Sequence, residues 1–443
     1  MACKENIMIY SEFIRRIAFW SIDLIRGAPV AHHVKDLRKT FANPQESQQL
    51  AKQRLDNILD HACKTTAFYK KFSGWQKLED FPVIQKKTIK ENYNDFTSSI
   101  YKNKKLFKTT TSGSYGTPMT FLLSSKKRAR QLAEIIFFNS WAGYKVGMRY
   151  AQVRVHPKGK FHLFRQNGVL INPSVIDSNW LEKNRNLLKK KKILFIVAYP
   201  SAILPLAKYC REKGDKPNDF VLKGIISGAE QLLHSVRKTF EETFGCIVFD
   251  RYALNELGVV SHECPSHKKH HINLASYKVE ILKLDSDWPA GPDETGRVVV
   301  TDLFSFAMPL IRYDTGDRSS FSSKSCPCGL DTPILNKIEG RVVESICDPS
   351  GKIINMAAID RDPKDLDGII QFQFIQKTKD TYIVKLKVTD SFTQENILRE
   401  RYLKLLGPQA KLIFEYVDSI PPLPSGKRPY IINEYIQRIK TSQ

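Results

Sequence analysis

The stretch TTTSGSYGTP, residues 109–118, is the strongest single signal in the sequence. Small and hydroxyl-bearing residues let a backbone approach a polyphosphate closely, and main-chain N–H groups with Ser and Thr hydroxyls can donate hydrogen bonds to its oxygens. The stretch differs from the GxxxxGK[ST] loop of the P-loop NTPases, because neither glycine is followed at the required spacing by Gly-Lys. A Gly/Ser turn without a ligand is the competing interpretation, so the surrounding sequence must separate the two.

Around this loop, from residue 108 to about 340, strand-like and helix-like segments alternate. The strand-like runs include ILFIVAY, GIISGAE, CIVFDRYAL and GRVVVTDL, and QLLHSVRKTFEETF is typical of the helical segments. This alternation predicts an α/β core with several sheets and crossover helices. About the first hundred residues are mostly helical in pattern. Apolar residues near helical spacing there are Leu50, Leu55, Ile58, Leu59 and Ala62.

After residue 340 the pattern changes to that of a small α+β unit. IIQFQFIQKTKDTYIVKLKV has period-two spacing on both sides of a turn, which predicts a β-hairpin. A helical stretch near residues 394–406 and the strand-like KLIFEYV follow. We therefore expect a large domain of residues 1–340, with a helical N-terminal region of about 1–105, and a small domain of residues 341–443.

Length and composition exclude several classes of protein. A chain of 443 residues with 42% hydrophobic and 11% aromatic residues can bury substantial cores and does not resemble a disordered protein. The longest apolar stretch, residues 193–207, is broken by Pro200, Ser201 and Pro205 and is shorter than the ~20 residues of a membrane helix. The eight cysteines are irregularly spaced and no signal peptide is evident, so we expect a reducing, cytoplasmic location.

The N-terminal segment IMIYSEFIRRIAFWSIDLIRG, residues 7–27, predicts an amphipathic helix. Glu12, Arg15, Arg16 and Asp23 interrupt its apolar residues. Two roles stay open: the helix packs on the protein's own body, or it lies on a membrane surface, which would be the inner face. The formal charge of +23 would attract nucleotides, nucleic acid or acidic lipid headgroups, but charge alone identifies none of them.

Five further motifs follow the TTTSGSYGTP stretch. They are ISGAE (226–230), YALNE (252–256), YDTGD (313–317), EGR (339–341) and PSGKRP (424–429). In this order, the six resemble the motifs of the adenylate-forming superfamily, and in detail those of its phenylacetate-CoA ligase branch with its CapK-like relatives from capsule biosynthesis. The resemblance covers nearly the whole chain, because the segment ending in HACKTTAFY is also similar to that branch.

The resemblance implies a large multi-sheet N-terminal adenylation domain and a small mobile α+β C-terminal domain. It also implies an enzyme that uses ATP and Mg²⁺ to activate a small carboxylic acid as an acyl-AMP, releasing pyrophosphate. Coenzyme A is then the default acyl acceptor, and an amine or sugar acceptor in surface polysaccharide biosynthesis is the alternative. No residue that we can identify selects the acid.

The same resemblance assigns roles by position. The ATP phosphates would be held by Thr111, Ser112, Gly113, Ser114, Gly116 and Thr117. The adenine pocket would be lined by Ser227, Gly228, Ala229, Glu230, Tyr252 and Ala253. Glu256 would help to hold Mg²⁺, since a hard cation prefers carboxylate and phosphate oxygen. Asp317, aided by Arg341, would accept hydrogen bonds from both ribose hydroxyls. Lys427 would reach the reacting groups from the small domain and offset developing negative charge.

Simpler roles compete with each assignment. Asp317 could cap a turn, Arg341 could form a surface ion pair, and Lys427 could be a solvated surface charge. The sequence also departs from the family pattern at Tyr115, in place of threonine, and at Ala253, in place of glycine. Both changes should be tolerated. The hinge after Arg341 carries Val343 and then Glu344, which makes the domain rotation and the second half-reaction less secure.

Cys264 in HECPSHKKHHI, and Cys326 and Cys328 in CPCG, form a second constellation. Thiolates and imidazole suit tetrahedral zinc, and a Cys-Pro-Cys-Gly turn presents two sulfurs on one side. By similarity to a Cys/His zinc site in this branch, His271 is the favoured fourth ligand, and His267 and His270 are alternatives. Four protein ligands would make the zinc structural. Unpaired cysteines in loops are the competing interpretation.

Two other classes of function remain to be weighed. A zinc-stabilised basic protein that binds nucleic acid would explain the charge and the Cys/His residues, and its binding would depend strongly on salt. It leaves six ordered motifs unexplained, so we expect no nucleic-acid partner. A scaffold that keeps the fold without catalysis is the third interpretation, and it rests on the departure at the hinge.

Overall fold

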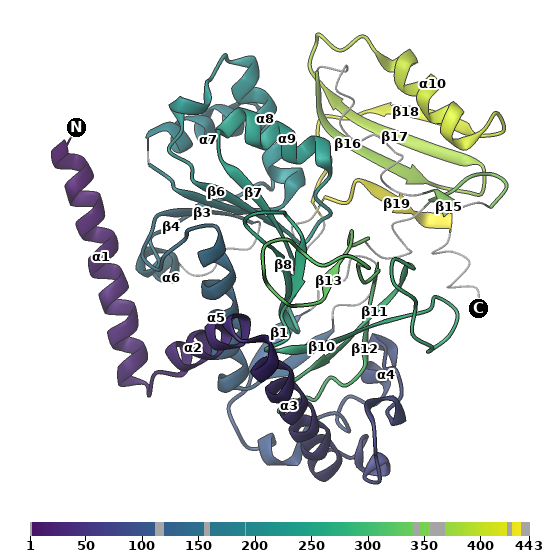
Figure 1. Ribbon diagram of the computed structural model, residues 1–443. Coiled ribbons are helices and arrows are strands. Elements are labelled where there is room, and N and C mark those ends of the chain that lie inside the picture. Colours follow the sequence, from purple (N-terminus) through teal and green to yellow (C-terminus); the bar gives the residue numbers. More distant parts are fainter. Residues whose placement is uncertain are drawn as a thin grey trace. The chain divides into compact units, whose positions relative to one another are not determined.

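Figure 1 shows a computed structural model of the protein, which describes residues 2–110, 119–154, 160–190, 192–339, 346–351, 353–354, 368–422 and 428–435. The chain forms two compact units. The first comprises Met1–Arg149, Phe161–Asn167 and Phe249–Glu339, and the second comprises Tyr150–Lys160, Gly168–Val248 and Gly340–Gln443. The predicted domain division near residue 340 stays a prediction, because residues 340–345 lie outside the described ones.

The first unit combines N-terminal helices with short antiparallel sheets. Its helical elements are α1 (Ala2–Ile25), α2 (Pro29–Ala42), α3 (Pro44–Thr65), η1 (Lys70–Phe72), η2 (Leu78–Asp80), α4 (Lys86–Glu91), η3 (Ser99–Tyr101), α5 (Ser125–Trp141) and most of α6 (Lys160–Arg165). Its strands are β1 (Phe107–Thr110), β2 (Thr120–Leu123), most of β7 (Ile247–Leu254), β8 (Gly258–Glu263), β9 (His270–Ile272), β10 (Tyr277–Leu282), β11 (Gly296–Asp302), β12 (Tyr313–Ser319) and β13 (Ile334–Leu335).

Strand pairing in this unit brings the motifs onto neighbouring elements. Strands β7, β8, β9 and β13 pair antiparallel in that order, and β10, β11 and β12 form an antiparallel sheet. Strands β1 and β2 form a hairpin in which Thr110 is opposite Thr120. A bridge between Ile84 and Tyr313 attaches the segment before α4 to β12. Strands β7 and β11 fall within the strand-like runs CIVFDRYAL and GRVVVTDL, and α1, α2 and α3 lie within the first hundred residues, where the sequence pattern is mostly helical.

The second unit contains a parallel sheet and a separate mixed sheet. Its helical elements are α7 (Ser178–Lys190), α8 (Pro200–Glu212), η4 (Pro217–Asp219), α9 (His234–Phe244) and α10 (Glu395–Leu406). Its strands are β3 (Tyr150–Val153), β4 (Gly168–Ile171), β5 (Phe195–Ala198), β6 (Gly224–Gly228), β14 (Ile346–Cys347), β15 (Ile353–Ile354), β16 (Ile369–Gln376), β17 (Thr381–Val388), β18 (Lys411–Tyr416) and β19 (Ile431–Asn433).

Both sheets of the second unit fit the sequence pattern. Strands β4, β3, β5 and β6 are parallel and are connected through helices, as a buried α/β sheet requires. Strands β16 and β17 form the predicted hairpin, with β18 and β19 added in parallel at its two edges. The α/β fold class with several sheets is therefore confirmed, together with the α+β character of the C-terminal segment.

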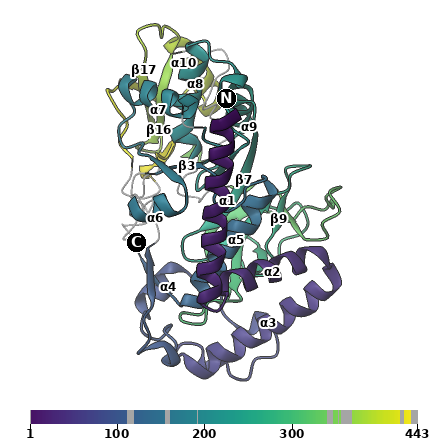
Figure 2. The same cartoon turned by 90° about the vertical axis from the view of Figure 1, so that its left-hand side faces the viewer.

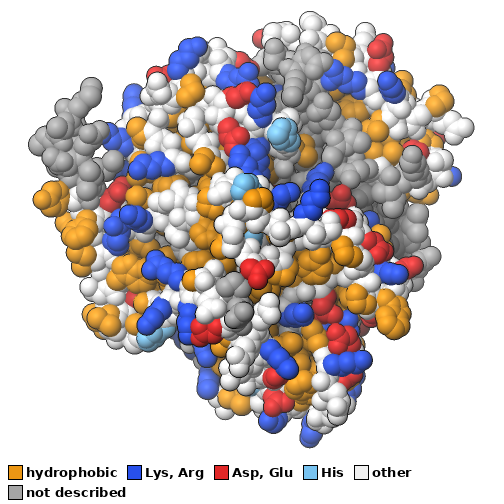
Figure 3. Space-filling view, viewed as in Figure 1, with side chains coloured by type: hydrophobic (Ala, Val, Ile, Leu, Met, Phe, Trp, Pro, Cys, Tyr) orange, Lys and Arg blue, Asp and Glu red, His pale blue; other side chains and the backbone are white. Residues whose placement is uncertain are grey.

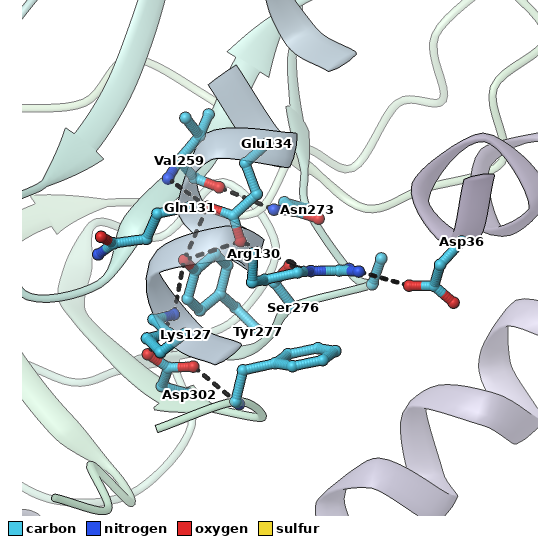
Figure 4. Close-up of polar contacts among 12 residues, drawn as sticks. Asp36, Lys127, Arg130, Gln131, Glu134, Val259, Asn273, Ser276, Tyr277 and Asp302 are labelled. Atoms are coloured by element: carbon cyan, nitrogen blue, oxygen red, sulfur yellow. Dashed lines mark hydrogen bonds and ion pairs between the residues drawn. The ribbon is translucent and has the colours of Figure 1, made fainter. Parts of the chain in front are cut away.

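Helix α5 carries charges into the core of the first unit. It begins after Ser124, whose side chain accepts a hydrogen bond from the N–H of Lys127 at 3.1 Å. Lys127 Nζ lies 2.6 Å from Asp302 Oδ2, and both side chains are fully buried. Arg130, also fully buried, pairs with Asp36 of α2 (Figure 4). Because an unpaired buried charge costs several kcal/mol, these pairs fix α5 against α2 and β11.

We expect Gly258→Ala to lower the free energy of unfolding by about 3 kcal/mol, through overpacking and backbone strain. Gly258 has a φ of +127°, and a Cβ there would lie 2.3 Å from Glu134 Oε2 and 2.6 Å from Tyr277 Oη. Gly143→Ala is the matched control, because Gly143 also has a positive φ of +84° but a Cβ there meets nothing within 4 Å. Urea denaturation of both variants measures the difference. Equal losses would show that the space around Gly258 does not constrain it.

Candidate functional site

The YALNE motif lies where β7 turns into β8. Tyr252 and Ala253 are in β7, and Glu256 follows in the turn. Glu256 is buried, with 2% of its surface exposed, and its Oε1 accepts a hydrogen bond from Tyr313 Oη at 2.9 Å. Lys86 Nζ, from the first residue of α4, lies 3.8 Å from the same oxygen. The carboxylate of Glu256, the predicted magnesium ligand, is thus contacted by the ammonium group of Lys86 and the phenol of Tyr313.

Buried side chains form hydrogen bonds with the backbone of this turn and of the residues that follow it. Gln131 Nε2 of α5 donates to the carbonyl oxygens of Asn255 at 3.2 Å and Leu257 at 3.0 Å. Tyr277 Oη donates to the Leu257 carbonyl at 2.7 Å, and Glu134 Oε2 accepts from the N–H of Val259 at 3.0 Å (Figure 4). The backbone on either side of Glu256, at Asn255 and Leu257, is therefore hydrogen-bonded to Gln131 and Tyr277. We call these two residues, with Lys127, Arg130, Glu134 and Asp302, the buried polar network.

The predicted phosphate loop begins beside the same turn. Asn255 Nδ2 donates to the Thr110 carbonyl at 3.1 Å, and Thr110 is the last residue of β1. Thr110 and Thr120 are paired across the β1–β2 hairpin, so the segment between them must connect two adjacent strands. The residues predicted to contact the phosphates all lie outside the described residues. They are Thr111, Ser112, Gly113, Ser114, Gly116 and Thr117.

Asp317, in β12, meets Tyr252 of the YALNE motif. Tyr252 Oη donates to Asp317 Oδ2 at 2.7 Å and lies 3.2 Å from Thr315 Oγ1. Burial, and then the negative charge of Asp317, raise the pKa of Tyr252 well above its ordinary value, so the phenol remains a donor. Gly316, with a φ of +80°, lies within β12 between Asp314 and Arg318, where the register against β11 shifts as at a β-bulge.

The SGAE motif belongs to the second unit. Ser227 and Gly228 end β6, and Ala229 has a left-handed φ of +66°. The Glu230 carboxylate accepts from the N–H of Ser201 at 3.0 Å and from its hydroxyl at 2.8 Å, at the first turn of α8. Glu230 therefore caps a helix, which satisfies donors that would otherwise lack partners. Its predicted role, and that of its neighbours, at the adenine stays a prediction.

Two predicted site residues, Arg341 and Lys427, lie outside the described residues. The residue after Lys427 is described: Arg428 is buried, and its guanidinium donates to the carbonyls of Ile420 at 2.8 Å and Ser174 at 2.8 Å, and to that of Pro173.

The four residues of the Cys/His constellation converge in the first unit. Their ligand atoms all lie within 4.8 Å of one another, and they come from Cys264, His271, Cys326 and Cys328. Cys264 Sγ and Cys326 Sγ are 3.7 Å apart, and Cys328 Sγ is 3.4 Å from His271 Nε2. Two corners of a tetrahedron with metal–sulfur bonds of 2.3 Å are about 3.8 Å apart, so the spacing suits a four-coordinate metal.

His271 is oriented for such a role. Its Nδ1 lies 2.7 Å from Thr332 Oγ1, which leaves Nε2 facing the thiols. Burial, and then the nearby His270, lower the pKa of His271 to about 4, so the imidazole is neutral, as a metal ligand must be. His270 is directed elsewhere, with Nδ1 3.1 Å from Ser261 Oγ. His267 contributes its backbone N–H to Cys264 Sγ at 3.4 Å.

Sequence patterns did not indicate several residues of this site. Lys86 lies in a lysine-rich run without a motif, and it reaches Glu256 only because residue 84 bridges to β12. Gln131 and Tyr277 contact the turn from distant segments, so no local spacing identifies them. Arg428 could have been noticed as the residue that follows Lys427 in PSGKRP.

Part of the chain matches a known family, and the chain is similar to known proteins over most of its length. Residues 346–434 match the family described as CapK C-terminal domain. Protein CapK of Staphylococcus aureus is 24% identical over 409 residues, which cover 87% of this chain and 89% of CapK. The phenylacetate-coenzyme A ligase of Thermus thermophilus is 25% identical over 324 residues, 67% of this chain and 71% of that protein.

A solved structure shares the fold. The crystal structure of 2-hydroxyisobutyryl-CoA ligase, in the postadenylation state with R3-HIB-AMP, aligns with a TM-score of 0.72 and 18% identity, covering 91% of this chain and 93% of that one. Together with the ordered motifs and the sequence relatives, this likeness supports assignment of the chain to the adenylate-forming superfamily of ligases, in the branch of the phenylacetate-CoA ligases and their CapK-like relatives.

Proposed function

We propose that this protein uses ATP and Mg²⁺ to convert a carboxylic acid into an acyl-AMP and then transfers the acyl group, by default to coenzyme A. The observation that supports this most directly is a pair of reciprocal hydrogen bonds between two motifs. Tyr252 of YALNE donates to Asp317 of YDTGD, and Tyr313 of YDTGD donates to Glu256 of YALNE. Each motif thereby holds the carboxylate of the other, and Asn255, the neighbour of Glu256, donates to the carbonyl of Thr110, where the described part of β1 ends.

In the proposed adenylation, Asp317 accepts hydrogen bonds from the ribose hydroxyls, because a carboxylate has acceptor sites beyond the one that Tyr252 uses. Glu256 fits a magnesium ligand as one buried carboxylate, with nucleotide phosphate oxygens completing a hard coordination sphere. An oxygen of the substrate carboxylate attacks the α-phosphorus, and the bond from that phosphorus to the bridging oxygen breaks. Pyrophosphate leaves with the electron pair, and Lys427 offsets the developing charge.

In the second step, the acceptor attacks the acyl carbonyl and AMP leaves. The similarity to phenylacetate-coenzyme A ligases supports a thiol acceptor, coenzyme A. The similarity to CapK supports the alternative, an amine or sugar acceptor in surface polysaccharide biosynthesis.

The decisive experiment is pyrophosphate release with ATP, Mg²⁺ and a panel of carboxylic acids. We expect at least one acid to stimulate release, and Lys427→Ala to lower that rate by roughly a hundredfold while ATP affinity stays nearly normal, because a transition-state contact is lost. Transfer from chemically supplied acyl-AMP should survive in the variant. An unchanged adenylation rate would make Lys427 a surface charge, and no release with any acid would favour the scaffold.

We expect Asp317→Ala to weaken ATP binding by about 2 kcal/mol, because ribose hydroxyls lose a charged acceptor. Isothermal titration calorimetry measures this, and Asp285→Ala, which removes an exposed carboxylate of the same charge, is the matched control. Circular dichroism should show that both variants remain folded. If the two variants bind ATP equally well, Asp317 is not part of the nucleotide site.

We further propose that the cluster of Cys264, His271, Cys326 and Cys328 holds one structural zinc ion. The donor set is soft, its spacing suits a tetrahedron, and Thr332 orients the histidine. Because all four positions would be protein ligands, the ion would stabilise the β9–β13 region and leave no position for substrate.

Protein purified without chelator should contain about one zinc per chain, and Cys326→Ser or Cys328→Ser should lower both the metal content and the midpoint of thermal unfolding. Mass spectrometry of the metal content and differential scanning calorimetry provide the measurements. Cys347→Ser is the control, because Cys347 lies in β14, outside the cluster. A zinc-free wild-type protein would contradict the assignment.

A further inference from the structure

Helix α1 presents an apolar stripe to solvent. Tyr10, Phe13, Ile14, Ile17 and Leu24 are each more than half exposed. Successive members are three, one, three and seven residues apart, so they line one face of the helix. Ile25, at the end of α1, is 86% exposed. No other described element lies in front of α1 in Figure 2. A face of this kind on a surface helix marks an interaction site.

The inner face of α1 contacts the rest of the first unit through polar groups and through the partly buried rings of Phe19 and Trp20. Asp23 is buried and accepts from the N–H groups of Val30 at 3.1 Å and Ala31 at 2.8 Å, which caps the start of α2. Arg16 Nε donates to the Val146 carbonyl at 3.0 Å. The docked face of α1 is therefore held by polar and apolar contacts together, and the exposed stripe is an additional apolar face that a surface helix does not need for its own packing.

A close backbone contact maintains this orientation. A Cβ at Gly147 would lie 2.3 Å from the carbonyl oxygen of Glu12, so only glycine admits α1 this closely. Glu12 is buried at the same place. Rolling the helix to bury its apolar stripe would move Asp23 and Glu12 out of their sites, and the stripe thus stays exposed while α1 is docked.

The charges at the margins of the stripe are positive. Arg26 is exposed, and Arg15 lies beside Phe164, a further exposed aromatic ring, with its guanidinium carbon 4.8 Å from the ring centroid. Among residues 10–25 of α1, for which burial is described, the acidic side chains are those of Glu12 and Asp23, and both are buried. In Figure 3, hydrophobic side chains gather along the left edge, where Figure 1 places α1, with Lys and Arg side chains beside them.

We propose that α1 docks by this stripe onto a membrane surface that contains acidic phospholipid. None of the described helices combines the length and apolar composition that crossing a bilayer requires, whereas a helix with one apolar face and basic margins can lie in the headgroup region. Acidic headgroups would attract Arg26, Arg15 and the chain's net charge of +23. Self-association through the stripe would instead bring two such positively charged surfaces together.

The test is co-sedimentation of the full chain with vesicles of phosphatidylcholine alone or with phosphatidylglycerol at about one third. We expect at least about tenfold tighter binding to the acidic vesicles, weakened by salt. Ile14→Glu/Ile17→Glu should reduce this binding by about tenfold or more, because two stripe residues lose apolar contact. Val221→Glu/Leu284→Glu is the matched control, since it places the same charge at exposed apolar residues away from α1 and should bind normally.

Two outcomes would overturn the proposal. One is equal binding of the wild-type protein and the Ile14→Glu/Ile17→Glu variant to acidic vesicles, or no preference for these vesicles over phosphatidylcholine. The other is a dimer in sedimentation velocity that this variant abolishes, which would make the stripe a protein interface. Circular dichroism should show that both double variants remain folded. Pyrophosphate release without vesicles should be unchanged in both, so the result does not depend on the proposed reaction.

Discussion

Two reciprocal tyrosine–carboxylate hydrogen bonds join the motifs on which this site depends. Tyr252 donates to Asp317 at 2.7 Å, and Tyr313 donates to Glu256 at 2.9 Å. Each motif thus orients the acid of the other, and neither acid can move without breaking a bond to the opposite strand. Because burial and the charge of Asp317 raise the pKa of Tyr252, its phenol stays protonated and remains a hydrogen-bond donor to the carboxylate. A rigid pair of acids is what pre-organised nucleotide binding requires.

This pair depends in turn on the buried polar network beneath it. Gln131 and Tyr277 bond the turn that carries Glu256, and Gly258 leaves room for the Tyr277 hydroxyl and the Glu134 carboxylate. Lys127 and Asp302 form a fully buried ion pair beside them. Such a network costs desolvation free energy and is stable only while every member is paired. Its contribution is therefore specificity of geometry, since a partly paired alternative would leave a charge buried.

The sequence predicts residues whose chemistry is carried by a local pattern, and it misses residues that act across the fold. Cys264 and Cys326 are recognisable by residue type, and the structure brings their sulfurs within 3.7 Å. Tyr277 has no such signal, because its contact with Leu257 exists only after β10 has folded beside the turn. For α1 the amphipathic pattern is readable, but the face that points inward is set by the close approach at Gly147, which belongs to a distant segment.

In the proposed reaction, Asp317 binds ATP before the reaction and Lys427 acts in the transition state. The contacts of Asp317 differ in kind from those of Arg428, the residue next to Lys427. Asp317 lies between the paired residues Asp314 and Arg318 of β12 and accepts a hydrogen bond from Tyr252. Lys427 adjoins Arg428, whose guanidinium is held by backbone carbonyls, including those of Ile420 and Ser174. Cation-to-carbonyl bonds can be exchanged for water without stranding a buried opposite charge, so such an anchor can release more readily than a buried ion pair. That difference suits a lysine that is needed for one half-reaction and must withdraw for the other.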